Sequence, residues 1–323
     1  MPGKIDTHVH WRDEEEAYKQ TIRGGSEQAA AQGIIAVGDM PNTKPPILWQ
    51  EDVIRRLRLA KERKPLVQYF LWIGLTSKRD QVEEAVRVVG EIPQVIGLKL
   101  YAGPTTGELG VTDENDQKKI YRILSALNYR GVLAVHCEKE KELKPARWDP
   151  EKPWTHGEAR PPLAEIKAVK DQIRFAKTVD FKGNLHICHA SCPETIEMVS
   201  KARIAGLKAS CEITPHHILL TDGRMRKREG LRFKVNPPLR RKEIVEGLRK
   251  NFLSKIGAEW IWIASDYAPH TLEEKLRPDA PSGIADYSLY SQLLNWLEGK
   301  GLFPLQIEQL TFRNVVKTFG GKF

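Results

Sequence analysis

The sequence predicts a single (β/α)8 barrel of the TIM type, and three observations favour this fold. Short apolar or β-branched runs recur along the 323 residues, and amphipathic helical patterns separate them. Strands that alternate with helices pair in parallel through crossover connections, and eight such units match a closed barrel. Titratable residues also recur where these runs end. A doubly wound open sheet is the alternative, but no Gly-rich phosphate loop follows the first run, which weakens it.

The expected elements follow one another in a regular order. The expected strands span residues 5–9, 34–40, 67–75, 95–101, 132–136, 184–190, 208–214 and 260–266. The expected helices lie near residues 24–32, 49–63, 78–90, 114–129, 163–178, 194–205, 241–255, 286–298 and 304–318. We therefore expect residues 1–323 to form one catalytic barrel domain.

Two long connections, 139–162 and 215–240, each follow an expected strand. Long loops after barrel strands commonly form the walls or lid of an active site, and a disordered surface excursion is the alternative.

Composition excludes several classes of protein. Lys and Arg number 51 against 42 Asp and Glu, a formal charge of +9, but the basic residues are scattered along helix faces as solvated charges are. No nucleic-acid-binding signature accompanies them, so we expect no nucleic-acid partner and an attraction for anionic metabolites instead. No apolar run is long enough to cross a bilayer and no leader is recognisable, so we expect no membrane partner and a cytoplasmic location. Four cysteines in a chain of this length do not indicate a disulfide framework or a zinc ribbon.

The first expected strand carries a pair of candidate metal ligands. Side chains two apart on a strand point the same way, so His8 and His10 present two imidazoles on one face. Imidazole is the commonest protein ligand for zinc, although an ordinary histidine pair is the alternative. Arg12 is in phase with both histidines, and a guanidinium beside a metal site favours an anionic substrate over a structural ion.

Polar and titratable residues continue around the same end of the expected barrel. They are Asn42 after the second strand, Lys99 in the fourth, His136 and Glu138 at the fifth, Cys188 and His189 in the sixth, Glu212 in the seventh and Asp266 at the eighth. Buried Lys, His and Asp side chains are costly unless they are paired or bind a metal. In a barrel, chemistry lies at the C-terminal ends of the strands, so the pattern predicts an active site there.

These residues lie in motifs that resemble a known family. The motifs are Asp6-Thr-His8-Val-His10-Trp-Arg12, Met40-Pro-Asn42-Thr-Lys-Pro45, Gly97-Leu-Lys99-Leu-Tyr101, His186-Ile-Cys188-His189, Cys211-Glu212-Ile-Thr-Pro-His216-His217, Asn236-Pro-Pro-Leu-Arg240 and Ser265-Asp266-Tyr-Ala-Pro-His270-Thr. Together, and in this order, they resemble a dihydroorotase of the amidohydrolase superfamily. The resemblance runs from residue 3 to about residue 316 and is closest to the dihydroorotase domain of the animal multifunctional pyrimidine enzyme.

The resemblance implies an activity and a fold. It implies zinc-dependent, reversible cyclisation of N-carbamoyl-L-aspartate to (S)-dihydroorotate in pyrimidine (UMP) biosynthesis, by a cyclic amide hydrolase. Family members fold as a (β/α)8 barrel, often with a small β-sandwich built from both termini. Because this chain enters its first strand almost at once and ends soon after the last helix, we expect the sandwich to be missing.

The resemblance also implies a ligand set. His8, His10 and Asp266 would hold one zinc, His136 and His189 a second, and Lys99 would bridge them as a carbamate formed with carbon dioxide. From the residues alone, Lys99 reads as a snorkelling or salt-bridged lysine. Cys188 and Glu212 match positions that contribute to a third zinc in the animal domain. A free core cysteine is the alternative for Cys188, because strict alternation places it on the opposite face from His189.

Roles toward the substrate follow from the same resemblance. Asp266 is suited to take a proton from the attacking water and to deliver it to the leaving nitrogen. The positions implied in substrate binding are Arg12, Asn42 and His270 for the carboxylate, Asn236 for the pyrimidine edge, Thr105 and Thr106 for a loop that closes over the substrate, and Ser282 and Gly283 for the backbone that lines the ring. A simple turn is the alternative for the threonine pair.

One departure and several alternatives stay open at this point. Tyr267 replaces a histidine that usually follows the catalytic aspartate, and we expect activity to survive with altered support for Asp266. A hydantoinase or allantoinase is the nearest alternative, but a neutral cyclic amide gives a buried Arg12 nothing to pair with. A catalytically silent scaffold is another, although every metal-ligand position is filled. A homodimer and an association with aspartate carbamoyltransferase are open partner interactions.

Overall fold

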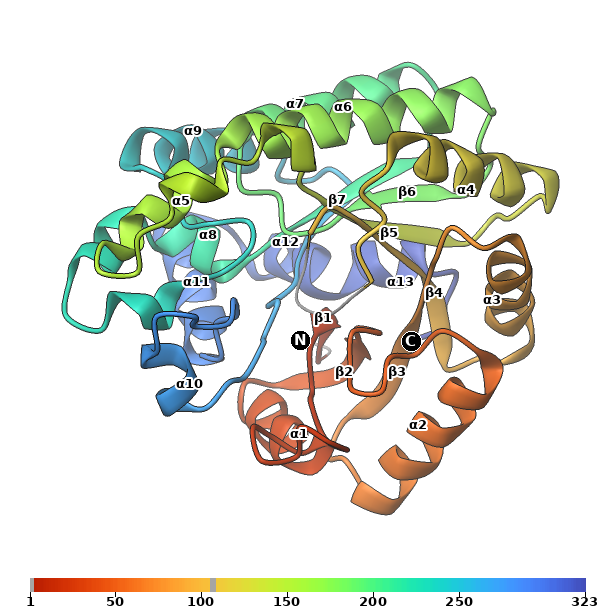
Figure 1. Ribbon diagram of the computed structural model, residues 1–323, viewed down its shortest axis with the longest axis horizontal. Helices are drawn as coiled ribbons and strands as arrows, with labels where there is room; N and C mark the ends of the chain where they lie inside the picture. The colour runs from red at the N-terminus through yellow and green to blue at the C-terminus, as the bar shows by residue number, and fades with distance from the viewer. Residues whose placement is uncertain (1–2, 105–108) are drawn as a thin grey trace.

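The computed structural model describes residues 3–104 and 109–323, and it confirms the barrel (Figure 1). Eight parallel strands pair in chain order from β1 to β8. Their bounds are β1 Lys4–Val9, β2 Ile34–Asp39, β3 Gln68–Gly74, β4 Val95–Ala102, β5 Val132–Cys137, β6 Asn184–Ile187, β7 Ala209–Ile213 and β8 Ile261–Ile263. Just beyond β8, an isolated parallel bridge from Val9 to Tyr267 joins the first and last strands, so the barrel nearly closes.

The longer helices surround the strands, as Figure 1 shows. They are α1 Ile22–Ala31, α2 Gln50–Arg63, α3 Arg79–Glu91, α4 Glu114–Ala126, α6 Pro162–Thr178, α7 Pro193–Ile204, α9 Lys242–Leu253 and α11 Ser288–Gly299. Local capping fixes several starts: the Thr21 hydroxyl accepts from the Gly24 amide before α1, and the Asp113 carboxylate accepts two amides at the start of α4. The helix expected at 304–318 is continuous but mixed, with α12 Pro304–Glu308, a π-helical turn Gln309–Arg313 and α13 Asn314–Thr318.

Both long connections are built from short helical turns, so neither is a disordered excursion. The first contains η1 Glu140–Glu142, η2 Pro145–Arg147, η3 Pro153–Thr155 and α5 His156–Ala159. The second contains α8 Pro215–Leu219, η4 Asp222–Arg226 and η5 Gly230–Phe233, and α10 Leu272–Leu276 follows β8. No helix of the described residues is long and apolar enough to cross a membrane.

The barrel interior is filled with apolar side chains at the end away from the C-terminal strand ends. Trp72 and Trp262 are fully buried, and their indole N–H groups donate to the Thr7 carbonyl at 2.9 Å and the Thr7 hydroxyl at 3.0 Å. Phe319, directly after α13, packs edge-on against both indoles. Gly97 is required beside them, because a Cβ there would lie 2.6 Å from the Val132 carbonyl oxygen. This packed end leaves the C-terminal strand ends to form the site.

Candidate metal centre and active site

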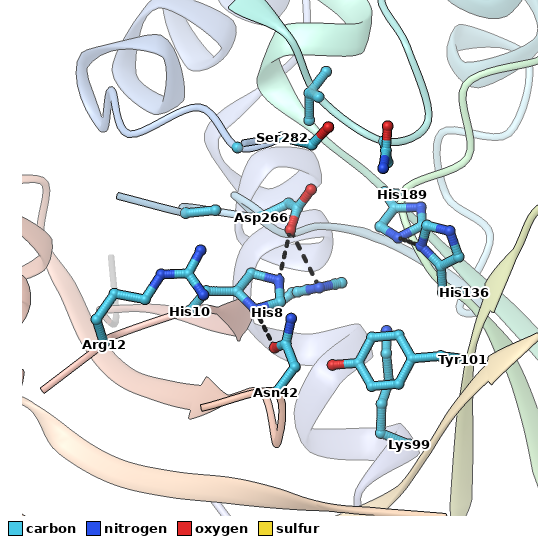
Figure 2. A pocket seen from close by; sticks show the side chains of 14 residues that line it. His8, His10, Arg12, Asn42, Lys99, Tyr101, His136, His189, Asp266 and Ser282 are labelled. Carbon is cyan, nitrogen blue, oxygen red and sulfur yellow. Dashed lines mark hydrogen bonds and ion pairs between the residues drawn. The ribbon is translucent and has the colours of Figure 1, made fainter. Parts of the chain in front are cut away.

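One pocket at the C-terminal ends of the strands collects most of the predicted site residues (Figure 2). It has an empty volume of about 420 Å³. Its lining comprises His8, His10, Arg12, Asn42, Lys99, Tyr101, His136, His189, Val235, Asn236, Asp266, Ala268, Ser282 and Gly283. Cys188 and Glu212 lie behind this lining, and His270 borders the wider opening next to it. Thr105 and Thr106 lie outside the described residues.

The first cluster of donor atoms comes from β1 and the end of β8. Asp266 Oδ1 lies 3.0 Å from His10 Nε2 and 3.3 Å from His8 Nε2. The ligand atoms of these three buried residues are close enough together to hold one metal ion. Burial by itself raises the pKa of Asp266, but His8 and His10 outweigh it and hold that pKa well below its usual range. Asp266 is therefore an ionised carboxylate in position to bind a cation or accept a proton.

Glu212 fixes the orientation of His8 from behind the pocket. Its carboxylate contacts His8 Nδ1 and accepts from His186 Nε2 at 3.0 Å and from the His189 amide at 3.1 Å. Burial raises the pKa of Glu212, but its contacts with His8 and His186 bring it well below the usual value. A carboxylate on one imidazole nitrogen leaves the other free as a ligand, which is the usual arrangement around metal-binding histidines. His8 Nε2 is thus directed at Asp266.

The second cluster comes from β5 and the turn after β6. His136 Nδ1 lies 3.0 Å from His189 Nε2, and His136 Nε2 lies 3.1 Å from Glu138. Arg160 holds Glu138 in turn, through Nε at 3.0 Å. His189 Nδ1 is buried without a hydrogen-bond partner in the described chain. Burial and the neighbouring His136 lower the pKa of His189 well below its usual value, so its ring is neutral and can act as a ligand.

Lys99 lies between the two clusters on β4. Its side chain is fully buried, its Nζ lies 3.0 Å from Cys188 Sγ and it faces the Tyr101 ring at 5.0 Å. No carboxylate of the described residues forms an ion pair with it. Both Cys188 and His189 reach the interior because β6 ends at Ile187 and His189 adopts a positive φ of 37°. The strict alternation that would place Cys188 and His189 on opposite faces therefore does not hold at this strand end.

These donor sets fit divalent metal ions. Imidazole nitrogens, a carboxylate and a buried amine without an ion-pair partner converge on one pocket, and a buried His189 nitrogen lacks a partner. A buried carboxylate and a buried imidazole nitrogen without a partner are costly unless a cation completes them. A second set of close donors, His8, Cys188 and Glu212, lies deeper. Both carboxylate oxygens of Glu212 already contact histidines, one His8 and the other His186.

A cationic group lies at the side of the pocket next to His10. Arg12 is 3% exposed, and its guanidinium bonds the Pro269 carbonyl at 3.2 Å and His270 Nε2 at 3.1 Å. Burial lowers the pKa of His270 to about 2, so the ring is neutral and accepts from Arg12. Asn42 Oδ1 accepts from His10 Nδ1 at 2.7 Å. None of the described carboxylates forms an ion pair with Arg12, which leaves guanidinium donors for an anion in the pocket.

The opposite wall is made largely of backbone. Gly283 has a φ of +153°, and a Cβ there would lie 2.6 Å from the Ala268 carbonyl oxygen, so only glycine permits this close approach. Asn236 Oδ1 lies 2.9 Å from His156 Nε2, on the first long connection. In Figure 2, Ser282 lies across the pocket from Lys99.

Comparisons with known proteins agree with this geometry. The model of the amidohydrolase family matches residues 1–206. The dihydroorotase of Methanothermobacter thermautotrophicus is 34% identical and covers 99% of this chain and 70% of its own. The dihydroorotase of Pyrococcus furiosus is 35% identical, over 99% of this chain and 67% of its own. The chain belongs to the dihydroorotases of the amidohydrolase family.

Solved structures extend the comparison of the fold. An L-hydantoinase from Arthrobacter aurescens has a TM-score of 0.80 at 22% identity, covering 99% of this chain and 71% of its own. A dihydroorotase from Saccharomyces cerevisiae has a TM-score of 0.78 at 18% identity, covering 99% and 84%. At these identities the likeness concerns the barrel fold alone. The fold does not show which cyclic amide this chain hydrolyses.

Three residues that contact the site or its neighbouring segments were given no such contact by the sequence analysis. Glu138 is visible there as a strand-end carboxylate, but nothing predicts that it contacts His136. His156 lies in a Pro- and Trp-rich connection with no periodic signal. Tyr267 points away from the pocket: its hydroxyl bonds Gln20 and Gln28 at 2.7 Å each, and its ring stacks on Tyr287. Its carbonyl accepts from the His10 amide at 2.8 Å, which ties the segment after Asp266 to β1.

Proposed function

We propose that this chain is a metal-dependent dihydroorotase, which interconverts dihydroorotate and N-carbamoyl-aspartate. The observation that carries the proposal is Arg12, a buried guanidinium without a carboxylate partner in the described chain, beside a cluster of metal-ligand side chains. Dihydroorotate carries a ring amide to be hydrolysed and a carboxylate that would complete this ion pair. The archaeal relatives named dihydroorotase support the same assignment.

Zinc is the metal that these donors suit best, since imidazole with carboxylate is a usual zinc environment. We assign His8, His10 and Asp266 to one ion and His136 and His189 to a second. Lys99 would hold both as a carbamate. Carbamate formation would replace its unpaired amine by an anionic group that suits two cations. When bound, two such ions would activate water and polarise the ring carbonyl. We propose two ions rather than three, because the Glu212 oxygens are engaged by His8 and His186.

The chain's own residues then divide the work. Asp266 accepts a proton from the attacking water and delivers it to the ring nitrogen as the amide bond breaks. In the reverse direction it takes that proton from the carbamoyl nitrogen and the ring closes with loss of water. Arg12, with His270 and Asn42, holds the substrate carboxylate. The proposed ring contacts are Asn236, Ser282 and Gly283. Thr105 and Thr106, outside the described residues, keep their proposed place in the loop over the substrate.

Further expectations stay predictions beside this proposal. They are a single catalytic barrel domain over residues 1–323, a homodimer, an association with aspartate carbamoyltransferase, a cytoplasmic location and a special likeness to the animal multifunctional domain. Sedimentation with and without the transferase tests the two partner predictions.

The test compares substrates that differ only in the carboxylate. Zinc-loaded protein should hydrolyse dihydroorotate well and dihydrouracil, which lacks the carboxylate, poorly. Arg12→Met removes a charge-assisted pair of about 1.5–3 kcal/mol, so kcat/KM for dihydroorotate should fall by about 10- to 150-fold, with little change for dihydrouracil. Arg79→Met, on an exposed ion pair of α3, is the control and should match wild type.

Two results would reject the assignment. Equal turnover of dihydrouracil and dihydroorotate by the wild type favours a hydantoinase-type substrate. No turnover of either substrate by protein with full metal content favours a catalytically silent scaffold.

A further inference from the structure

Lys275 is a buried lysine to which the proposed chemistry gives no role. It lies on α10, is 6% exposed, and directs its ammonium at three backbone carbonyls. The acceptors are the carbonyl oxygens of Lys234 at 2.9 Å, Pro281 at 2.9 Å and Gly283 at 2.8 Å. An ammonium has three N–H donors, so this arrangement uses every one. Burial, with Lys234 and Arg12 nearby, lowers the pKa of Lys275 to about 7, so the charge is costly and the three carbonyls offset that cost.

The three carbonyls belong to the two segments that form the backbone wall of the pocket. We call residues 234–236 and 281–283 the ring wall. Val235, Asn236, Ser282 and Gly283 of this wall line the pocket. The Gly283 amide also donates to the Lys234 carbonyl at 2.9 Å, so the two segments meet directly where Lys275 joins them. Both are loop segments without a strand ladder of their own, and Lys275 supplies three of their cross-links.

The carbonyl contacts also determine where the amides point. In a trans peptide the C=O and the following N–H point in opposite directions. The Pro281 carbonyl faces Lys275, so the Ser282 N–H faces away from it. Within the described chain, that N–H donates to no protein acceptor. A cation on the carbonyl side also polarises the peptide and strengthens its N–H as a donor.

We propose that Lys275 is a positioning residue that holds the ring wall so that the Ser282 amide donates to a carbonyl oxygen of the substrate ring. The ligand class is a cyclic amide or imide with a carbonyl acceptor next to the scissile bond. This inference rests on the proposed dihydroorotase function for the identity of the substrate, but the order of the ring wall is independent of it.

The kinetic test uses zinc-loaded protein and Lys275→Met, which keeps the length of the side chain and removes its donors. Ring contacts made in both ground and transition states affect KM rather than kcat, so KM for dihydroorotate should rise about 10-fold or more, with kcat nearly unchanged. Lys275→Arg keeps the charge and should recover part of this loss. Lys250→Met, on the exposed face of α9, is the control.

Hydrogen exchange supplies a readout that needs no turnover. In Lys275→Met, amides of the ring wall should exchange faster than in wild type, while those of β1 and β5 should not change. If Lys275→Met does not fold, Lys275→Arg and Lys275→Gln carry the same comparison.

Each result decides between the two proposals. Unchanged KM together with unchanged exchange in the ring wall overturns the role of Lys275. If kcat falls only as far as the fraction of folded or metal-loaded protein falls, and KM is unchanged, Lys275 has a merely structural role. That result also overturns the proposal. Absence of dihydroorotate turnover in the wild type removes the proposed substrate, and exchange then decides whether Lys275 orders the wall.

Discussion

Glu212→Gln tests whether Glu212 supports His8 or binds a metal itself. Oε1 of Glu212 contacts His8 Nδ1 and the His189 amide, and Oε2 contacts His186 Nε2. A glutamine can keep its oxygen on the first two donors and place its NH2 against His186. His186 can adapt by exchanging tautomers, because its Nδ1 lies 3.0 Å from the Ser210 hydroxyl, which both donates and accepts.

The magnitude follows from these contacts. Two hydrogen bonds to a charged acceptor become bonds to a neutral one, a loss of about 1 kcal/mol each. The free energy of unfolding of the metal-free protein should therefore fall by about 2 kcal/mol. Because His8 keeps a partner that fixes its tautomer, metal affinity should fall by about 10-fold, whereas Glu212→Ala leaves Nδ1 without one and should approach about 100-fold.

The assay is urea unfolding of metal-free protein combined with competition against a chromophoric chelator and metal analysis. Glu91→Gln, on the exposed end of α3, serves as the control, and Cys188→Ser tests the other deep donor. If Glu212 is itself a metal ligand, both Glu212→Gln and Cys188→Ser lose one equivalent of metal while the remaining sites keep wild-type affinity. That result, or wild-type affinity in Glu212→Ala, refutes the supporting role.

Four further predictions address the metal, the lysine that would hold it, the proton transfer and the pH dependence. Prolonged chelation should abolish dihydroorotate hydrolysis and zinc should restore it, and Lys99→Ala should lose at least one metal with partial rescue by small carboxylic acids; unchanged metal content in Lys99→Ala contradicts the bridge. Asp266→Asn should lower kcat by about 10²–10⁴-fold while calorimetry still detects dihydroorotate binding, and wild-type kcat contradicts its role. Burial, with Arg160 and Lys234 nearby, lowers the pKa of His156 from 6.5 to about 3. Below pH 6.5 the unfolded chain binds a proton at His156 that the folded chain does not. The free energy of unfolding therefore decreases as the pH is lowered, by roughly 2 kcal/mol from this group at pH 5. In urea titrations His156→Gln should lose less stability between pH 7 and pH 5 than wild type, and an equal loss contradicts the prediction.

The pattern of elements and most of the pocket were predictable from the sequence. Apolar runs and helical periodicity depend on local spacing, which is why the expected runs match β1 to β8 within a few residues. The ends of parallel strands meet at one end of a barrel, so strand-end residues such as His8, Lys99 and His136 had to converge. Their identity as a family ligand set came from the motifs rather than from spacing.

Contacts across the barrel were beyond local reasoning. Glu212 reaches His8 over 204 positions, and His156 reaches Asn236 over 80. Their side-chain types alone do not specify these partners, because a buried carboxylate or imidazole can be satisfied by many groups. The positive φ of His189 and of Asp266 is set by the packing around the strand ends.

The sequence by itself determined the barrel, the strand ends that bear chemistry and the residues expected to bind metal and carboxylate. Only the tertiary structure decided which groups hold those residues in place. Lys275 makes the reason clear: its acceptors are backbone carbonyls, which every residue carries. Side-chain identity therefore gives no signal for such a contact, and only the fold brings the three oxygens to one ammonium.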